Sequence, residues 1–190
     1  RRSLGPATAR YRERGTAANL MAFQRMAMLP TRNFQKSRFE GVEALSAEEL
    51  RPARERARVS CASCTIGCTH LYGVGGDGAT RVEYENLFAL GPLCGISDPE
   101  AVLLASQRCD ALGLDTVSAG GTIAFAMECA ERGYLEAAPR FGDAPGLLAL
   151  LDDIAHRRGL GDLLAEGSRR AAQRIGRDAL DFAPQVKGLE

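Results

Sequence analysis

Three cysteines lie within eight residues, in the segment Cys61-Ala-Ser-Cys64-Thr-Ile-Gly-Cys68. The chain has six cysteines in 190 residues, which is too few for a disulfide scaffold. Thiols clustered this closely indicate metal binding in a reducing compartment, and we therefore expect a cytoplasmic protein.

The spacing C-x2-C-x3-C argues against several common kinds of cysteine site. A zinc ribbon needs a second, well-separated C-x2-C pair, and the sequence has none. A thioredoxin-type redox pair would use Cys61 and Cys64 alone and would leave Cys68 without a role. Radical enzymes that use S-adenosylmethionine have the two gaps in the opposite order.

Three close thiols with a distant fourth ligand suit a 4Fe–4S cluster, because one short loop can cover a single face of the cube. Gly67 would let the backbone approach the cluster sulfurs and donate N–H bonds to them. The main alternative is a zinc site of Cys61, Cys64, Cys68 and His70 in a non-catalytic helical module. Thiols without any ligand are a third interpretation.

The fourth ligand of such a cluster is not obvious within the chain. Cys109 and Cys129 fall inside expected helices with apolar neighbours, where a free cysteine behaves as a small hydrophobic residue. Cys94, in the segment Gly-Pro-Leu-Cys-Gly, is the remaining internal candidate.

Helix signals dominate the elements that would position these residues. One helix is expected over residues 98–113, with Asp98 as N-cap, Pro99 at the first helical position and Gly113 at the left-handed end. A second runs from Ser118 to Gly133 by the same signals. Further helices are expected over residues 16–27, 143–159 and 161–176.

Strand signals are few. Residues 70–74 and 79–85 could pair across a glycine-rich turn as one short hairpin. Residues 31–58 are polar and rich in arginine, and we expect them at the surface. Because the helices carry wide apolar stripes, they should be buried against one another. The expected fold is mainly α, a helical domain with at most a short β-hairpin.

Charge and hydropathy exclude several classes of partner. Lys+Arg and Asp+Glu both number 24, so no net field favours nucleic acid or an anionic membrane. No apolar run approaches the roughly 20 residues that span a bilayer, and residues 1–15 lack the apolar core of a signal peptide. Since the chain begins with Arg1 rather than Met, we expect it to be a piece of a longer protein.

Further segments, together with the cysteine loop, make the sequence similar to a known family. They read VEYENLFALGPLCGI, CDALGLDTVSAGGTIAFAMECAERG, LLAEGSRRAA and VKGLE. From about residue 29 to its end, the chain resembles the aldehyde ferredoxin oxidoreductase family of tungsten, sometimes molybdenum, bis-pterin enzymes. The resemblance implies that residues 1–160 form the middle helical domain, and residues 161–190 the incomplete beginning of the C-terminal helical domain, of a multidomain enzyme.

The resemblance implies a role for the cysteine loop. In the family this loop binds a 4Fe–4S cluster, so Cys61, Cys64 and Cys68 would be ligands, and the fourth cysteine would come from a later segment outside this chain. Thr65 stands where proline commonly follows the second cysteine, which lowers the rigidity of the loop without removing a ligand.

The segment Asp110-Ala-Leu-Gly113-Leu114-Asp115 matches the family's first pterin-binding motif. The helix macrodipole disfavours a carboxylate in the last helical turn, and two adjacent N–H groups on the edge of a pterin would compensate for this. Gly113 permits the sharp turn that lets a flat ring approach. Without the resemblance, a solvated aspartate at a frayed helix end is the favoured alternative for Asp110.

By motif position, Glu85 matches the family's active-site glutamate, Tyr84 its neighbouring tyrosine and Lys187 a lysine close to the active site. A carboxylate in a dry pocket has a raised pKa and could take a proton as oxygen adds to an aldehyde carbon. The alternative is a solvated Glu85 paired with an arginine such as Arg81. Gln185 stands where relatives have histidine, and glutamine cannot carry a proton at neutral pH.

The resemblance also implies the activity and the partners of the whole enzyme. It would oxidise an aldehyde to a carboxylic acid at a tungsten or molybdenum bis-pterin centre. Electrons would leave through the cluster to ferredoxin or a similar acceptor. The other domains of the same enzyme would complete the site, and a homodimer is an option that the sequence leaves open.

Overall fold

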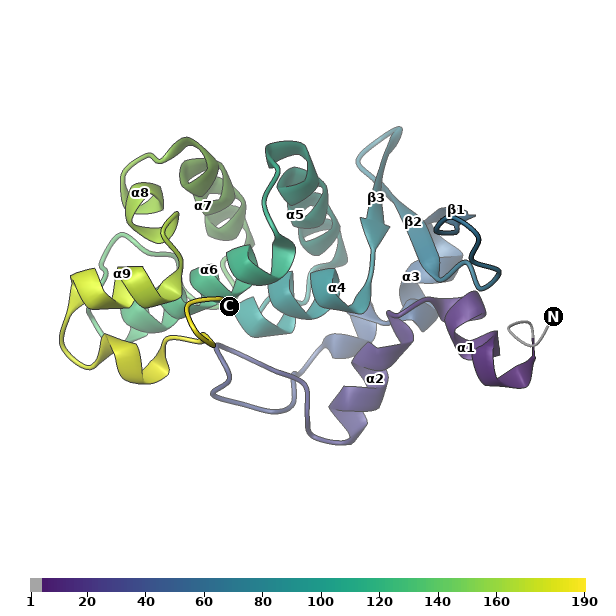
Figure 1. Cartoon of the computed structure of the whole chain (residues 1–190), viewed down its shortest axis with the longest axis horizontal. Coiled ribbons are helices and arrows are strands. Elements are labelled where there is room, and N and C mark those ends of the chain that lie inside the picture. Colours follow the sequence, from purple (N-terminus) through teal and green to yellow (C-terminus); the bar gives the residue numbers. More distant parts are fainter. Residues whose placement is uncertain (1–4) are drawn as a thin grey trace.

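The structure is a computed structural model that describes residues 5–190 of the chain. Helices make up most of it, which confirms the mainly α prediction, and a small sheet lies toward the amino-terminal end (Figure 1). The helices are α1 (Pro6–Arg14), α2 (Ala18–Arg25), α3 (Ala47–Arg54), α4 (Tyr84–Leu90), α5 (Pro99–Leu112), α6 (Thr116–Glu131), α7 (Ala144–His156), α8 (Leu160–Leu164) and α9 (Ser168–Ile175). The strands are β1 (Glu55–Val59), β2 (Thr69–Val74) and β3 (Gly78–Val82), and the short 3-10 helices are η2 (Val42–Leu45), η3 (Pro92–Cys94) and η4 (Ala179–Phe182).

The sheet has the strand order β1-β2-β3, and both pairs are antiparallel. The expected hairpin is present, with His70 opposite Val82 and Val74 opposite Gly78. Its second strand is shorter than predicted, because residues 84–85 begin α4 instead of continuing the strand. The prediction of at most one hairpin was wrong in this detail, since β1 adds a third strand to the sheet. Four of the five residues of β1 are exposed, so it has no apolar face from which a strand could be recognised.

The stretch 31–58 is not all surface, contrary to the prediction. Val42, Leu45 and Leu50 in this stretch are at most 2% exposed. Helix α3 begins at Ser46, whose hydroxyl accepts the backbone N–H of Glu49 at 3.3 Å. The few apolar residues are separated by polar ones, so the overall composition concealed a segment with one buried face.

The boundaries of α5 agree with the prediction. The side chain of Asp98 accepts the backbone N–H of Glu100 at 3.0 Å, and Gly113 ends the helix in the left-handed conformation with φ 71°. Residues 109–112 therefore form the last turn, which places Asp110 there as expected.

Four of the expected helices differ from the prediction in their boundaries. Helix α2 is shorter, spanning Ala18–Arg25 instead of residues 16–27. Helix α6 begins earlier, because its N-cap is Asp115, which accepts the backbone N–H of Ser118 at 2.8 Å. Helix α7 ends at Arg157, which has a left-handed φ of 51°. The single helix expected over 161–176 is broken into α8 and α9 at Gly167, where φ is 83°. The C-terminal segment packs against this break.

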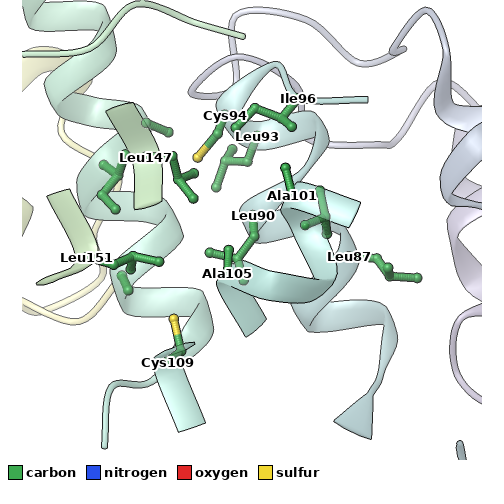
Figure 2. Packing of buried hydrophobic residues seen from close by; sticks show 14 of the residues in the cluster. Leu87, Leu90, Leu93, Cys94, Ile96, Ala101, Ala105, Cys109, Leu147 and Leu151 are labelled. Carbon is green, nitrogen blue, oxygen red and sulfur yellow. The ribbon is translucent and has the colours of Figure 1, made fainter. Parts of the chain in front are cut away.

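One hydrophobic core joins the sheet to the helices. Figure 2 shows Leu90 and Leu93 on one side of this core and Leu147 and Leu151 on the other. The same core includes Tyr72 of the central strand β2, which is completely buried. The loops at the ends of the strands and helices are therefore attached to one packed unit.

Helices α4 and α6 approach each other so closely that only glycine fits at the contact. A Cβ atom on Gly120 would lie 2.5 Å from the carbonyl oxygen of Ala89 and 2.7 Å from its carbonyl carbon. The thiol of Cys94 donates to the same oxygen at 3.3 Å, and to the carbonyl of Gly120 at 3.5 Å. The contact fixes α4, and with it the residues at the amino end of α4, against the helical layer.

Among residues 5–190, no single helix is long and apolar enough to cross a membrane. The pair Tyr84–Cys94 and Pro99–Leu112, bent by 120°, meets the length and composition requirement only when its two members are counted together.

Replacing Gly120 with alanine should lower the free energy of unfolding by about 1–3 kcal/mol, although alanine is the better helix former by about 1 kcal/mol. The added methyl group would meet backbone atoms of Ala89, which can move only together with α4. Gly121→Ala is the matched control, because its Cβ would meet no backbone atom and only Cβ and Cγ of Glu190, at 3.2 and 3.5 Å, in the C-terminal segment rather than in a packed helix. Urea unfolding followed by circular dichroism measures both variants. Equal stability of the two would contradict the backbone contact.

Candidate functional site

The cysteine loop connects β1 to β2, so both of its ends are held by the sheet. It contains a turn in which the backbone N–H of Cys64 donates to the carbonyl of Cys61 at 3.0 Å. Gly67 has a φ of 63°, and a Cβ there would lie 2.9 Å from the hydroxyl of Ser60, so the tight loop requires glycine at this position. All three thiols are free; Cys61 is exposed, and Cys64 and Cys68 are half-buried.

The surroundings of Cys64 and Cys68 shift the pKa values of their thiols in opposite directions. The backbone N–H groups of Ile66 and Gly67 donate to the sulfur of Cys64 and lower the pKa of its thiol. Burial, and after it the charge of Glu83, raises the pKa of the Cys68 thiol. A sulfur that accepts backbone N–H bonds is a suitable cluster ligand, because such bonds stabilise sulfur-bound negative charge. The residues of this loop therefore fit a 4Fe–4S cluster.

The arrangement does not favour the alternative zinc site. Within the part of the chain that the structure describes, no three His, Cys, Asp or Glu side chains converge where a single metal ion could bind. His70 is 1% exposed, and its Nδ1 lies 2.8 Å from Oε1 of Glu55. Its ring packs beside Gly15 and stacks on Tyr72. The imidazole is thus part of the interior of the sheet and does not join the thiols.

The other three cysteines belong to the core. Burial raises the pKa of Cys94, which donates its S–H to the carbonyls of Ala89 and Gly120. Burial also raises the pKa of Cys109 and of Cys129 to about 12. Cys94, the internal candidate for the fourth ligand, is therefore a core residue in this structure.

The strand β3 leads into α4 through Glu83, which places Tyr84 and Glu85 in the first helical turn. The ring of Tyr84 lies between Phe23, edge-on at 5.1 Å, and Phe88, stacked at 5.0 Å. Burial, and after it the charge of Glu85, raises the pKa of Tyr84 to about 12. The carboxylate of Glu85 is exposed, so the described residues alone do not form the dry pocket expected around it.

The α5–α6 junction presents the candidate pterin residues. Asp110 is exposed, and no hydrogen bond to its carboxylate is found among the described residues. Gly113 adopts the left-handed turn that the motif predicted. Asp115 has a structural task as the N-cap of α6, and Leu114 is half-buried beside it.

Two neighbouring cavities connect this junction with the C-terminal segment, which lies beside α6 (Figure 1). The smaller, about 260 Å³, is lined by Leu114 and Asp115 and by residues of the α8–α9 region and the C-terminal segment. The larger, about 630 Å³, is lined by Phe88 of α4, by residues of α6 and by Gln185. Both cavities include Glu190. Lys187 is exposed and lines neither of them.

The structure thus brings the α5–α6 junction, one face of α4 and the C-terminal segment together. The amide oxygen of Gln185 accepts the backbone N–H of Gly188 at 2.8 Å, so this side chain is used to shape the terminal turn. The cysteine loop joins two strands of the sheet. It is connected to α4 because Glu83, the N-cap of α4, accepts the hydroxyl of Thr69, the residue after Cys68.

Two polar residues with long-range hydrogen bonds were missed from the sequence. Asn33 donates to Oε2 of Glu128 at 2.7 Å and to the carbonyl of Phe182 at 3.0 Å, and no local pattern reveals partners so distant along the chain. Glu83 did have a local signal, because Asn86 three residues later accepts its backbone N–H at 2.9 Å, as in a helix-capping box.

Comparison with known proteins shows the family to which the chain belongs. The family model described as aldehyde ferredoxin oxidoreductase, domains 2 and 3, matches residues 3–190. The chain therefore belongs to the aldehyde ferredoxin oxidoreductase family, an oxidoreductase family with tungsten-containing members.

Two curated relatives are tungsten-containing aldehyde ferredoxin oxidoreductases. The one from Thermococcus kodakarensis is 39% identical over 184 residues, and the one from Pyrococcus furiosus is 36% identical over 184 residues. Each alignment covers 93% of this chain but 30% of the relative, so the chain spans about a third of the length of these relatives.

Among solved structures, the chain is similar to the active site complex BamBC of benzoyl coenzyme A reductase in complex with 1,5-dienoyl-CoA. The TM-score is 0.78 and the sequence identity 26%, with 94% of this chain and 28% of that chain covered.

Alkylation of the folded, metal-free protein should separate the two groups of cysteines. We expect iodoacetamide to modify Cys61, which is exposed, and Cys64, whose thiol has a lowered pKa, and to leave the three buried thiols unmodified until the protein is unfolded in concentrated urea. Peptide mass spectrometry at increasing times measures the order. Modification of Cys94 as fast as Cys61 would contradict the core position of Cys94.

Proposed function

We propose that this chain works as part of a larger enzyme that oxidises aldehydes to carboxylic acids at a tungsten or molybdenum bis-pterin centre. The observation that carries the proposal is the C-x2-C-x3-C loop between β1 and β2, which presents Cys61, Cys64 and Cys68 as free thiols that are exposed or half-buried. The family to which the chain belongs supports the reaction class.

In this proposal Cys61, Cys64 and Cys68 hold three corners of a 4Fe–4S cluster, and a segment outside this chain supplies the fourth ligand. Asp110 accepts N–H groups from the edge of a pterin, since its carboxylate has no hydrogen bond among the described residues. The turn formed by Gly113, Leu114 and Asp115 sets the position of that carboxylate. When bound, the metal–pterin centre and the cluster supply the redox chemistry, in two-electron and one-electron steps respectively.

The proposed task of Glu85 is to accept a proton at its carboxylate as oxygen adds to the substrate carbon. The remaining domains of the enzyme would cover this carboxylate and exclude water from it, which favours proton uptake. With a pKa of about 12, the hydroxyl of Tyr84 stays protonated at neutral pH, so it can donate a hydrogen bond to a substrate oxygen but does not act as a base.

The C-terminal segment has a narrower proposed role. Lys187 would supply a positive charge beside the carboxylate product. Gln185 can donate a hydrogen bond but cannot carry a proton, so Glu85 would be the single proton carrier among these residues.

The proposed electron acceptor is ferredoxin or a similar carrier, and the remaining domains of the same enzyme are the proposed structural partners. A cytoplasmic location is consistent with six free cysteines, which persist in a reducing compartment.

Glu85→Gln in the full-length enzyme should lower kcat by a factor on the order of 10² or more, while tungsten and iron contents stay at the wild-type values. The amide keeps the size of the side chain but cannot take a proton. Glu136→Gln is the control, because Glu136 is an exposed glutamate outside the site. Turnover of the Glu85 variant at the wild-type rate would remove this residue from the mechanism.

Cys64→Ala in the full-length enzyme should abolish the iron-dependent absorption in the visible range, because the cluster loses a ligand with backbone N–H support. Cys94→Ala, which removes a core thiol, should retain the iron and lose about 1 kcal/mol of stability. Metal analysis and acid-labile sulfide on anaerobically purified protein measure the first effect. Colourless wild-type protein containing one zinc ion would refute the cluster.

A further inference from the structure

Glu83 lies where three distant segments of the chain meet. Its Oε1 accepts the hydroxyl of Thr69 at 3.0 Å, and its Oε2 accepts the hydroxyl of Thr16 at 2.5 Å. Thr69 directly follows Cys68 and is 4% exposed. The carboxylate is itself largely shielded, with 18% of its side chain exposed. One side chain thus connects the end of the cysteine loop, the turn between α1 and α2 and the start of α4.

The turn between α1 and α2 contacts both the start of α4 and the end of the cysteine loop. The hydroxyl of Thr16 accepts the backbone N–H of Tyr84 at 2.9 Å while it donates to Glu83. Gly15 packs on the cysteine loop so closely that a Cβ there would lie 2.6 Å from the carbonyl oxygen of Cys68. Its φ of 63° also favours glycine. The turn therefore touches the third cysteine and the first residue of α4 at once.

Glu83 also fixes the orientation of α4. It is the N-cap residue, and its backbone N–H donates to the side chain of Asn86 at 2.9 Å. A turn of the amino end of α4 relative to the sheet would break the bond between Glu83 and Thr69. It would also break the bond between Tyr84 and Thr16. Tyr84 and Glu85 follow directly, so their positions depend on the same residue that binds Thr69.

We propose that Glu83 is a positioning residue that holds Cys68, through Thr69, in a fixed relation to the Tyr84–Glu85 pair. The inference rests on the proposed function, because it treats Cys68 as a cluster ligand and Glu85 as the proton acceptor. Glu83 touches neither the cluster nor the substrate. It acts through the hydroxyl of Thr69 and the cap of α4.

The link has a chemical consequence for the cluster as well as a geometric one. Hydrogen-bonded residues behind a metal ligand hold that ligand in place, and their loss costs about 10- to 100-fold in metal affinity. The Glu83 carboxylate, whose Oε1 is also paired at 3.4 Å with Nε of the exposed Arg81, bonds to the residue that follows Cys68. Its replacement by an amide would leave the Arg81 charge unpaired there. A fixed negative charge disfavours addition of an electron, so it holds the midpoint potential of a nearby cluster down.

The test uses the full-length enzyme, purified without oxygen, with three variants. Thr69→Val removes the hydroxyl and keeps the shape and the cap of α4. Glu83→Gln removes the charge and keeps most of the hydrogen-bonding geometry. Asn86→Ala weakens the cap of α4 and leaves the bond between Glu83 and Thr69 in place. The readouts are the rate of iron release to a chelator, the midpoint potential by redox titration with paramagnetic resonance detection, and the melting temperature.

We expect Thr69→Val to release iron about tenfold faster or more, with a melting temperature close to that of the wild type. Glu83→Gln should keep its iron but show a more positive midpoint potential. Asn86→Ala should lower the melting temperature while its iron release and midpoint potential match the wild type.

Iron release and midpoint potential at wild-type values in both Thr69→Val and Glu83→Gln would overturn the positioning role and reduce Glu83 to a helix cap. That result would leave the proposed function intact, because the cluster would still be present. Wild-type enzyme without iron would instead refute the proposed function itself.

Discussion

The carboxylate of Glu83 joins three segments that are far apart in the sequence. Two threonine hydroxyls donate to it, one from the turn after α1 and one from the start of β2. A charged acceptor makes stronger hydrogen bonds than a neutral one, and partial burial strengthens them further. The cysteine loop and the first turn of α4 are consequently held together, although Cys68 and Glu85 lie on different elements.

The far end of α4 is held by a different kind of force. Here the backbones of α4 and α6 are in van der Waals contact, and the missing side chain of Gly120 lets Ala89 approach this closely. The buried thiol of Cys94 contributes a weak donor to the same contact. The helix is thus anchored by polar bonds at its amino end and by close packing toward its carboxyl end. Few orientations satisfy both conditions.

This anchoring matters because α4 lies between two groups of functional candidates. The cysteine loop is attached at the amino end of α4. Phe88 of α4 lines the larger cavity together with the C-terminal segment, which also lines the smaller cavity at the α5–α6 junction. Under the proposed function, α4 is a rigid spacer between the cysteine loop and the cavities beside the α5–α6 junction. The exposed carboxylates of Asp110 and Glu85 are the groups that the rest of such an enzyme would have to cover.

The sequence by itself determined the features that depend on local chemistry. Asp98 and Gly113 predicted the ends of α5, since capping involves residues within a few positions of each other. The glycine-rich turn between residues 70–74 and 79–85 predicted a hairpin, and the cysteine spacing predicted a loop that presents three thiols. Strand β1 was not predicted, because its residues are stabilised by pairing with β2 rather than by an apolar face of their own.

Only the tertiary structure decided which distant groups would meet. Nothing near His70 in the sequence indicates that its Nδ1 forms a hydrogen bond with the carboxylate of Glu55. Nothing near Cys94 indicates that its thiol donates to the carbonyls of two helix residues. The same holds for Glu83 and its two threonine partners. A hydrogen bond between residues remote in the chain depends on how whole elements pack, and that packing results from the summed burial of many side chains. Local sequence therefore determined which groups were available, and the packing of the core determined which of them became neighbours.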